Sequence, residues 1–402
     1  MPGNRRDVEL SLRKNPLEMK ITIIGAGIGG LTTAIALRKF RPDLELEIFE
    51  GSSELKAIGA GLGLGANAVL GYEQLGMKEK VLAVSNVLDC LQIRHFKGQV
   101  ISRVDNLAIN HNLQTISNFS IHRADLQRVL LDAAADVPLF LGKKLTHFLA
   151  EEDSVKLRFS DGLEWETDFV IAADGIRSVF RQKLLPDSKI RFAGYTCWRG
   201  VAPALPEGWP SKTAAEMVGL GKRFGIVPLP KNRVYWFAVV NANEPNDKHF
   251  AGMGKSELLD QFGAFAQPVR VLVESTPAEE ILHNDIMDFV PIGRFAFGRI
   301  LLLGDAAHAT TPNMGQGACQ AIESAVILGK TLSKNEAVEP AFFEFEQRRL
   351  KRTAFIVNRS WQLGKVMQTA NPLLAGIRNT LFRLIPQQVN ERQVKSLLEV
   401  EF

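Results

Sequence analysis

The residues with the clearest chemical potential lie beyond position 300, where Gly304 and Asp305 end an apolar run. Pro312 follows in a polar turn, and Gly315 and Gly317 open a long stretch with apolar residues at helical spacing. This order predicts strand, turn and helix. A helix start has unpaired N–H groups and the positive end of the macrodipole, and glycines let a ligand approach it closely. The segment fits a site for an anionic or electron-rich ligand, although an ordinary βα turn would have the same outline.

A second glycine cluster, Gly25, Ala26, Gly27 and Gly30, comes directly after the first β-rich run of the chain. A helical stretch follows, and the next apolar run ends in Glu50. In a dinucleotide fingerprint the first glycine makes a tight turn, the second lets the backbone meet a pyrophosphate, and the third lets the helix pack on the strand. The acidic residue 20 positions on (50 − 30 = 20) accepts hydrogen bonds from ribose hydroxyls. Strand, helix and acid are all present, so this segment predicts a dinucleotide site.

A third segment has Asp174 and Gly175 after an apolar run, with Ser178 and Arg181 at the start of a predicted helix. Taken alone, these residues fit any turn between a strand and a helix. Arg123 opens another predicted helix, where it would contact a phosphate or lie on the surface.

Glycines also recur at every second position from 59 to 65. No apolar strand precedes them, so we reject a second nucleotide loop. We expect instead a glycine-rich backbone close to a flat ligand, with a helix beginning at Asn67.

Composition narrows the class of protein. A chain of 402 residues with 46% hydrophobic content exceeds one usual core, so two domains or a large insertion are expected. A net charge of +4 without basic runs argues against nucleic acid. Three widely spaced cysteines indicate a reducing compartment, with the cytoplasm as the default, and no histidine pattern predicts a metal. No run of about eighteen apolar residues predicts a membrane span.

The order and separation of three motifs resemble the FAD-dependent aromatic hydroxylases of the p-hydroxybenzoate hydroxylase superfamily. These motifs are GxGxxG with Glu50, DGxxSxxR at 174–181 and GDAAHxxxPxxGxG at 304–317. The likeness covers most of residues 19–363 and is greatest to the salicylate, urate and 3-hydroxybenzoate hydroxylase branch. It implies an α/β fold, with a Rossmann-like FAD-binding domain of the GR2 type, an inserted, largely antiparallel β-sheet substrate domain and a long C-terminal helix.

The resemblance also assigns cofactor contacts. The N-terminal fingerprint would hold the ADP half of FAD, and Arg123 would reach its phosphates. Asp174 and Gly175 belong to a motif linked to the pyrophosphates of FAD and NAD(P)H, Asp305 would bind the ribityl chain, and the turn from Pro312 would border the isoalloxazine ring. The expected cofactor-binding residues are Gly25, Ala26, Gly27, Gly30, Glu50, Arg123, Asp174, Gly175, Gly304, Asp305, Pro312, Gly315, Gln316 and Gly317.

The order of predicted elements suggests a discontinuous FAD-binding domain and an interleaved substrate domain. A hairpin is expected to turn near positions 230–233, and a long helix is expected over 342–362. The expected divisions are a disordered extension at 1–18, the FAD-binding domain at 19–78, 112–184 and 283–335, the substrate domain at 79–111 and 185–282, and a helical segment at 336–402.

The resemblance implies an NAD(P)H-dependent monooxygenase that inserts one oxygen atom from O2 into a small electron-rich aromatic or heterocyclic substrate through a C4a-hydroperoxyflavin. NADH or NADPH would be the electron donor, and the protein would be a monomer or homodimer. The alternatives are a reductase or epoxidase of the same fold acting on a polyketide, isoprenoid or antibiotic, and a non-catalytic flavin-binding sensor.

Three residues are candidates for substrate contact. Arg223 and Tyr235 lie on predicted hairpin partners, twelve positions apart (235 − 223 = 12), and the pair resembles one in the urate hydroxylase branch. A guanidinium offers a planar fork for a carboxylate or paired carbonyls. An exposed arginine on a sheet edge is the alternative, because the turn register is not readable from sequence. Tyr195 is a third candidate, and for both tyrosines the alternative is buried packing with a satisfied hydroxyl.

Overall fold

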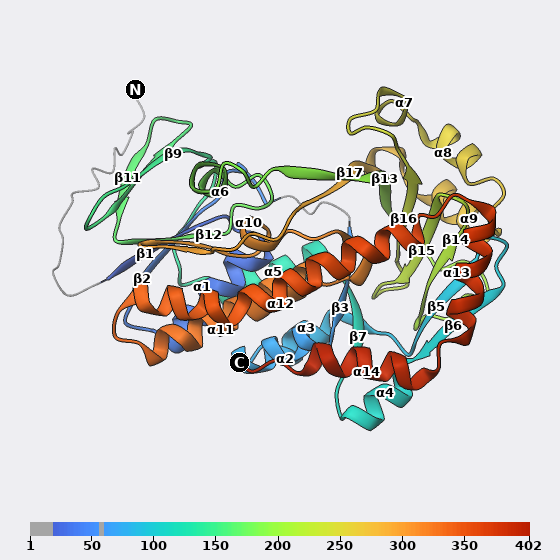
Figure 1. Ribbon diagram of the computed structural model, residues 1–402, viewed down its shortest axis with the longest axis horizontal. Coiled ribbons are helices and arrows are strands. Elements are labelled where there is room, and N and C mark those ends of the chain that lie inside the picture. Colours follow the sequence, from blue (N-terminus) through green and yellow to red (C-terminus); the bar gives the residue numbers. More distant parts are fainter. Residues whose placement is uncertain (1–18, 56–59) are drawn as a thin grey trace, which may run out of the picture.

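The computed structural model describes residues 19–55 and 60–402. The predicted extension at 1–18 lies outside this range. Two large sheets lie at opposite ends of the molecule, and a long helix, α12 (Val338–Met367), runs from one toward the other (Figure 1). The chain crosses between the two ends several times, so each end is assembled from segments far apart in the sequence.

The first sheet is parallel except at one edge, where β18 runs antiparallel to β19. Its central strands are buried on both faces, which accounts for their almost uninterrupted apolar sequence. In spatial order the strands are β18 (Ala296–Phe297), β19 (Ile300–Leu302), β12 (Phe169–Ala172), β1 (Lys20–Ile24), β2 (Glu45–Phe49) and β8 (Leu139–Phe140).

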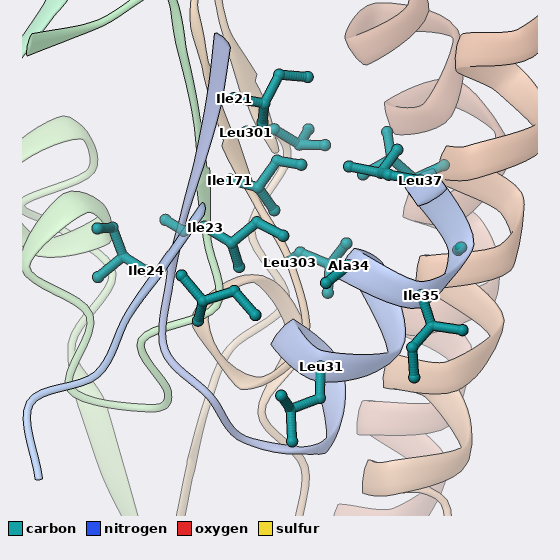
Figure 2. Close-up of a cluster of buried hydrophobic side chains, with 14 of the residues drawn as sticks. Ile21, Ile23, Ile24, Leu31, Ala34, Ile35, Leu37, Ile171, Leu301 and Leu303 are labelled. Carbon is teal, nitrogen blue, oxygen red and sulfur yellow. The ribbon is translucent and has the colours of Figure 1, made fainter. Parts of the chain in front are cut away.

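Helix α1 (Ile28–Phe40) packs on this sheet, and buried side chains of the helix and the strands together form the main hydrophobic core at this end (Figure 2). Ile21, Ile171 and Leu301, from three neighbouring strands, are completely buried together with Leu31 of α1. The helices associated with this end are α5 (Arg123–Ala133), α6 (Val179–Leu184), α10 (Asp305–His308) and α11 (Gly317–Lys334).

The second sheet has seven strands, and every pairing is antiparallel except that of β14 with β5. One face is a core of Trp198, Phe224 and Trp236, packed together with residues of α8 and α9. The strands in order are β17 (Leu282–Phe289), β13 (Ile190–Ala202), β16 (Val234–Asn241), β15 (Lys222–Pro228), β14 (Thr213–Val218), β5 (Cys90–His95) and β6 (Val100–Asp105), with helices α7 (Lys248–Ala251), α8 (Lys255–Gln261), α9 (Pro268–Ser275) and η1 (Ala278–Glu280) nearby in sequence.

Two three-stranded sheets complete the β structure of the residues that the structure describes. The glycine-rich segment forms strand β3 (Gly61–Gly65), which pairs with β7 (Asn118–His122). Gly59 lies outside the described residues. The remaining elements are β4 (Ser85–Val87), β9 (Leu145–Ala150), β10 (Val155–Phe159), β11 (Glu164–Thr167), α2 (Ala66–Leu75), α3 (Lys78–Ala83) and α4 (Asn106–Leu113).

Three helices end the chain: α12, α13 (Pro372–Leu384) and α14 (Gln387–Leu398). The predicted long helix is confirmed, and it extends several residues beyond the predicted 342–362 at each end. Within the described ranges, no helix combines the length and the apolar character needed to cross a bilayer.

Candidate cofactor and substrate site

The N-terminal glycines form a tight loop between β1 and α1. Gly25 has φ +107°, and a Cβ there would lie 2.4 Å from the Ala173 carbonyl oxygen. A Cβ on Gly30 would lie 1.9 Å from the Gly25 carbonyl oxygen, so helix and loop approach too closely for any side chain. Gly27 differs because a Cβ there would meet nothing within 4 Å. Its open side, beside a helix start without acidic residues or a side-chain cap, fits an anionic group.

Glu50 lies against this loop at the end of β2. One carboxylate oxygen accepts a hydrogen bond from the Ala26 N–H at 2.8 Å, and the other accepts from the Ser52 N–H at 2.8 Å. The side chain is half-buried, so it is held in place and still reached by solvent. A carboxylate has acceptor sites beyond these two, as ribose hydroxyls would require.

Asp174 and Gly175 follow β12, the neighbour of β1 in the parallel sheet. One Asp174 oxygen accepts from the Val179 N–H at 2.9 Å, while Oδ1 is buried without a partner in the described part of the chain. Desolvation raises the pKa of Asp174. Gly175 has φ +79° and open space where a Cβ would lie. The unpaired oxygen and the open glycine fit a ligand at this loop.

Arg181, the last residue of the same motif, has a structural position. It is completely buried and donates hydrogen bonds to the carbonyls of Ile176 and Ala306. Ser178 caps the helix by accepting a hydrogen bond from the Arg181 N–H. These two residues shape the turn that presents Asp174.

Gly304 and Asp305 follow β19, the next strand of the sheet. Gly304 has φ +62° and immediately precedes the short helix α10, which begins at Asp305. The Asp305 side chain is exposed, yet enough protein surrounds it for desolvation to raise its pKa, and the nearby charge of Arg123 opposes that shift. Arg123 is also exposed, at the start of α5. The fold thus brings Arg123 near Asp305, although 182 positions separate them (305 − 123 = 182).

The turn after α10 contains the 3₁₀ helix η2 (Pro312–Met314). Pro312 and Gly315 are exposed, and Gly315 has φ +63°. The predicted helix start near Gly315 is confirmed to within two residues: Gly315 takes the left-handed conformation that ends η2, and α11 begins at Gly317. The first turn of α11 has neither an acidic residue nor a side-chain cap, so its positive end is open to a ligand.

Gln316 is the one predicted residue of this turn that is buried. Its Oε1 accepts a hydrogen bond from Asn67 at 2.9 Å. Asn67 also donates to Glu323, a completely buried carboxylate that forms ion pairs with Arg349 and Arg352, both at 2.7 Å. Desolvation raises the pKa of Glu323, but the two arginines outweigh it, and the pKa lies below its usual value. This network holds the start of α11 against α2 and α12.

Sequence reasoning missed this network. Its signal is the spacing of Gln316, Gln320 and Glu323, three polar residues on one face of an otherwise apolar helix. Polar side chains at such positions need buried partners.

The strand register places Arg223 and Tyr235 on the same face of the second sheet. Arg223 pairs with Val239 across β15 and β16, and residues two and four positions from Val239 share its face. This is the face opposite the Trp236 core. The hairpin turns between Pro228 and Val234, as predicted.

Arg223 is 3% exposed, so an exposed arginine on a sheet edge is excluded. Its strand lies inside the sheet, between β14 and β16. The guanidinium donates to Gln368 Oε1 at 2.7 Å, to Glu216 Oε1 at 2.9 Å and to Asn313 Oδ1 at 3.0 Å. It therefore joins the sheet to the end of α12 and to η2.

Asn313 connects the substrate-side candidates to the Pro312 turn. Its amide nitrogen donates to the Tyr195 hydroxyl at 2.8 Å, while its oxygen accepts from Arg223. Desolvation raises the pKa of Tyr195 and of Tyr235. A cavity of about 280 Å³ borders Tyr195 and Gln368.

Strand β3 lies between Tyr235 and the turn that contains Pro312 and Gly315. A Cβ on Gly61 would lie 2.4 Å from the Tyr235 Cβ, and a Cβ on Gly315 would lie 3.5 Å from the Gly63 carbonyl oxygen. A Cβ on Gly63 would meet nothing within 4 Å. Gly61 thus allows Tyr235 to pack on β3, and at Gly63 the backbone of the strand is not covered by other protein atoms.

The three cysteines are buried and unpaired. In the two described ranges, no group of three or more His, Cys, Asp and Glu side chains gathers in a way that would hold a metal ion.

Comparison with known proteins supports the assignment of the three glycine motifs to an FAD site. A family model described as an FAD binding domain matches residues 18–360. The aurachin C monooxygenase/isomerase of Stigmatella aurantiaca is 36% identical over 91% of this chain and 94% of its own length. The 2-heptyl-3-hydroxy-4(1H)-quinolone synthase of Pseudomonas aeruginosa is 31% identical over 93% of this chain and 96% of its own.

The solved structure of Klebsiella pneumoniae HpxO complexed with FAD and uric acid has a TM-score of 0.86 at 28% identity. The likeness covers 94% of this chain and 97% of that one. This structural similarity confirms the predicted α/β fold. From its three glycine motifs, its fold and these matches, the chain belongs to the FAD binding domain family and is an FAD-dependent monooxygenase.

Proposed function

We propose that this protein uses NADH or NADPH, O2 and FAD to hydroxylate a small, electron-rich aromatic or heterocyclic compound between the Pro312 turn and the Arg223 face of the second sheet. The observation that carries this proposal is Asn313, which bonds to Arg223 and Tyr195 from within η2. The similarity of this chain to a quinolone synthase and to an FAD-dependent urate hydroxylase of Klebsiella pneumoniae supports a heterocyclic substrate.

In this proposal the three glycine motifs hold FAD. The bare side of Gly27 and the open start of α1 would receive the pyrophosphate, and Glu50 would accept from the ribose hydroxyls. Arg123 and Asp305 would contact the phosphates and ribityl chain, with Asp174 beside them. Bound FAD supplies hydride acceptance and activation of O2 for transfer of one oxygen atom.

The protein's part at the reacting end is positioning and exclusion of water. The open start of α11 would stabilise negative charge on the reduced cofactor. Tyr195 and Tyr235, whose pKa values are raised by burial, would stay protonated near neutral pH and act as hydrogen-bond donors rather than bases. Arg223 has three partners already, so its first role is to fix Asn313.

The buried, unpaired cysteines support a reducing compartment, and we propose the cytoplasm. NAD(P)H would dock transiently, because the sequence has a single dinucleotide fingerprint.

The reaction is tested by measuring NADH and NADPH oxidation with phenols, purines and 4-quinolones, followed by product analysis under ¹⁸O2. A true substrate should accelerate anaerobic flavin reduction and gain one ¹⁸O atom. If FAD is bound but no compound accelerates reduction, a sensor is favoured. If reduction is fast but no product takes up oxygen, a reductase is favoured.

The cofactor assignment is tested separately with Glu50→Lys. The change replaces a hydrogen-bond acceptor with a cation that has none, so FAD should be lost during desalting. Glu45→Lys, at the exposed beginning of the same strand, is the matched control and should keep FAD. Equal retention by both variants would remove Glu50 from the site.

A further inference from the structure

Helix α13 is anchored by one face only. Ala375 and Arg378 are buried, and the Arg378 guanidinium donates to the Met367 carbonyl at 2.8 Å. Phe382 packs against a cluster that includes Ile101 of β6 and Val218 of β14. These three α13 residues lie at helical spacing, so this face fixes the helix on the edge of the second sheet.

The other face of α13 is apolar and open to solvent. Its side chains recur at i, i+4, i+8 and i+11 from Leu373, which makes one continuous stripe along the helix. A shallow groove of about 370 Å³ runs along it. The exposed fractions are 74% for Leu373, 55% for Leu374, 49% for Ile377, 59% for Leu381 and 70% for Leu384. So much exposed apolar surface on one helix marks an interaction site.

Along the chain, the charged residues that flank this stripe are basic. Residues 347–390 include eight Lys and Arg and no Asp or Glu. Arg359, Lys365 and Arg383 are exposed in this segment. A partner that matches both the apolar stripe and its surroundings must therefore offer an apolar interior behind a negatively charged surface.

A second copy of the chain matches poorly. Two copies meeting stripe to stripe would bring cations together, which is unfavourable. The stripe is also small: thirteen residues at about 1.5 Å each make a helix of roughly 20 Å, and about 10 Å of width gives some 200 Å², against about 800 Å² per partner in stable dimers. A bilayer has no such minimum area, because an amphipathic helix sinks into it by itself.

We propose that α13 docks this protein on the surface of an anionic lipid bilayer. The helix lies in the plane of the membrane with the Leu373 stripe among the acyl chains, and Lys365 and Arg383 lie near the lipid headgroups. Because Gln368, which borders the 280 Å³ cavity, is four residues from the start of α13, docking brings that cavity close to the bilayer.

Vesicle co-sedimentation of the full-length, FAD-loaded protein tests the proposal. Binding is expected to vesicles of phosphatidylcholine with 30% phosphatidylglycerol, weaker binding to phosphatidylcholine alone, and release at high salt. The double variant Leu373→Glu/Leu381→Glu should reduce partitioning at least about tenfold, because two apolar contacts are replaced by charges that anionic lipid repels. Arg383→Glu should weaken binding to the anionic vesicles alone.

Leu149→Glu is the matched control, since Leu149 is an exposed leucine, 51% accessible, on β9 at the other end of the molecule (Figure 1). It should bind vesicles as the wild type does. All variants should keep the wild-type melting temperature and FAD content. Wild-type protein that stays in the supernatant with anionic vesicles overturns the proposal. If light scattering also shows a dimer that the double variant loses, the stripe is instead an interface between two copies.

Discussion

Replacing Arg223 with alanine should destabilise the protein as well as impair catalysis. The change removes three charge-assisted hydrogen bonds and leaves Glu216, Gln368 and Asn313 without that partner. Breaking a buried ion pair costs about 3–5 kcal/mol. The Glu216 side chain is 24% exposed and can regain water, so the lower limit, about 3 kcal/mol, is expected.

That loss converts into a melting temperature. An unfolding entropy of about 2.1 cal/mol/K per residue over 402 residues is about 0.8 kcal/mol/K, so the melting temperature should fall by about 4 °C. Because Asn313 would also lose its Arg223 partner, about 2 kcal/mol of transition-state stabilisation should be lost, and kcat/KM should fall about 30-fold. The FAD content should not change. Tryptophan fluorescence melts and steady-state kinetics measure the two effects.

Arg270→Ala is the control for charge removal, since Arg270 pairs with Glu274 on an exposed helix face. Surface pairs contribute about 0–1 kcal/mol, so its melting temperature should change by about 1 °C or less. If Arg223→Ala melts like wild type, the buried bonding of Arg223 is not what holds η2 and α12 to the sheet. If it melts lower but has normal kinetics, Arg223 is purely structural.

Two further predictions separate packing from binding and address pH. The Gly30→Ala variant should unfold or fail to accumulate, because its Cβ would lie 1.9 Å from the Gly25 carbonyl oxygen. The Gly27→Ala variant should have the wild-type melting temperature but bind FAD more weakly, because a Cβ there meets no protein atom within 4 Å. If Gly27→Ala binds FAD as tightly as the wild type, this loop does not face the cofactor. Burial, and to a lesser extent Arg349, lower the pKa of His308 to about 3. The unfolded chain therefore binds a proton below about pH 6.5 that the folded protein does not, and stability should fall as the pH drops from 6.5 toward 3, by about 1.4 kcal/mol per unit at most. Denaturant unfolding across this range gives the free energy of unfolding as a function of pH. For His308→Gln this free energy should change with pH with a slope smaller than that of the wild type by the equivalent of one proton. A slope equal to that of the wild type would contradict the assignment.

The sequence by itself determined the elements that hold the three glycine motifs, and the fold class with them. Gly25 and Gly30 meet steric limits within one strand, loop and helix, and limits of such short range are visible in residue types and spacing. The buried strands before Asp174 and Asp305 were recognisable for the same reason, because their apolar runs end where the loops begin. The positions at which α11 and α12 begin and end were less certain, since several starts are nearly equal in energy.

Only the tertiary structure decided what surrounds Arg223, Glu323 and the outer face of α13. Arg223 bonds to Gln368 and Asn313, 145 and 90 positions away, and no local pattern specifies such partners. Whether an amphipathic stripe is covered also depends on the rest of the chain: the face of α13 that includes Phe382 meets the second sheet, and the Leu373 stripe meets solvent. Local spacing shows that a face is apolar, but long-range packing decides whether the protein itself covers it.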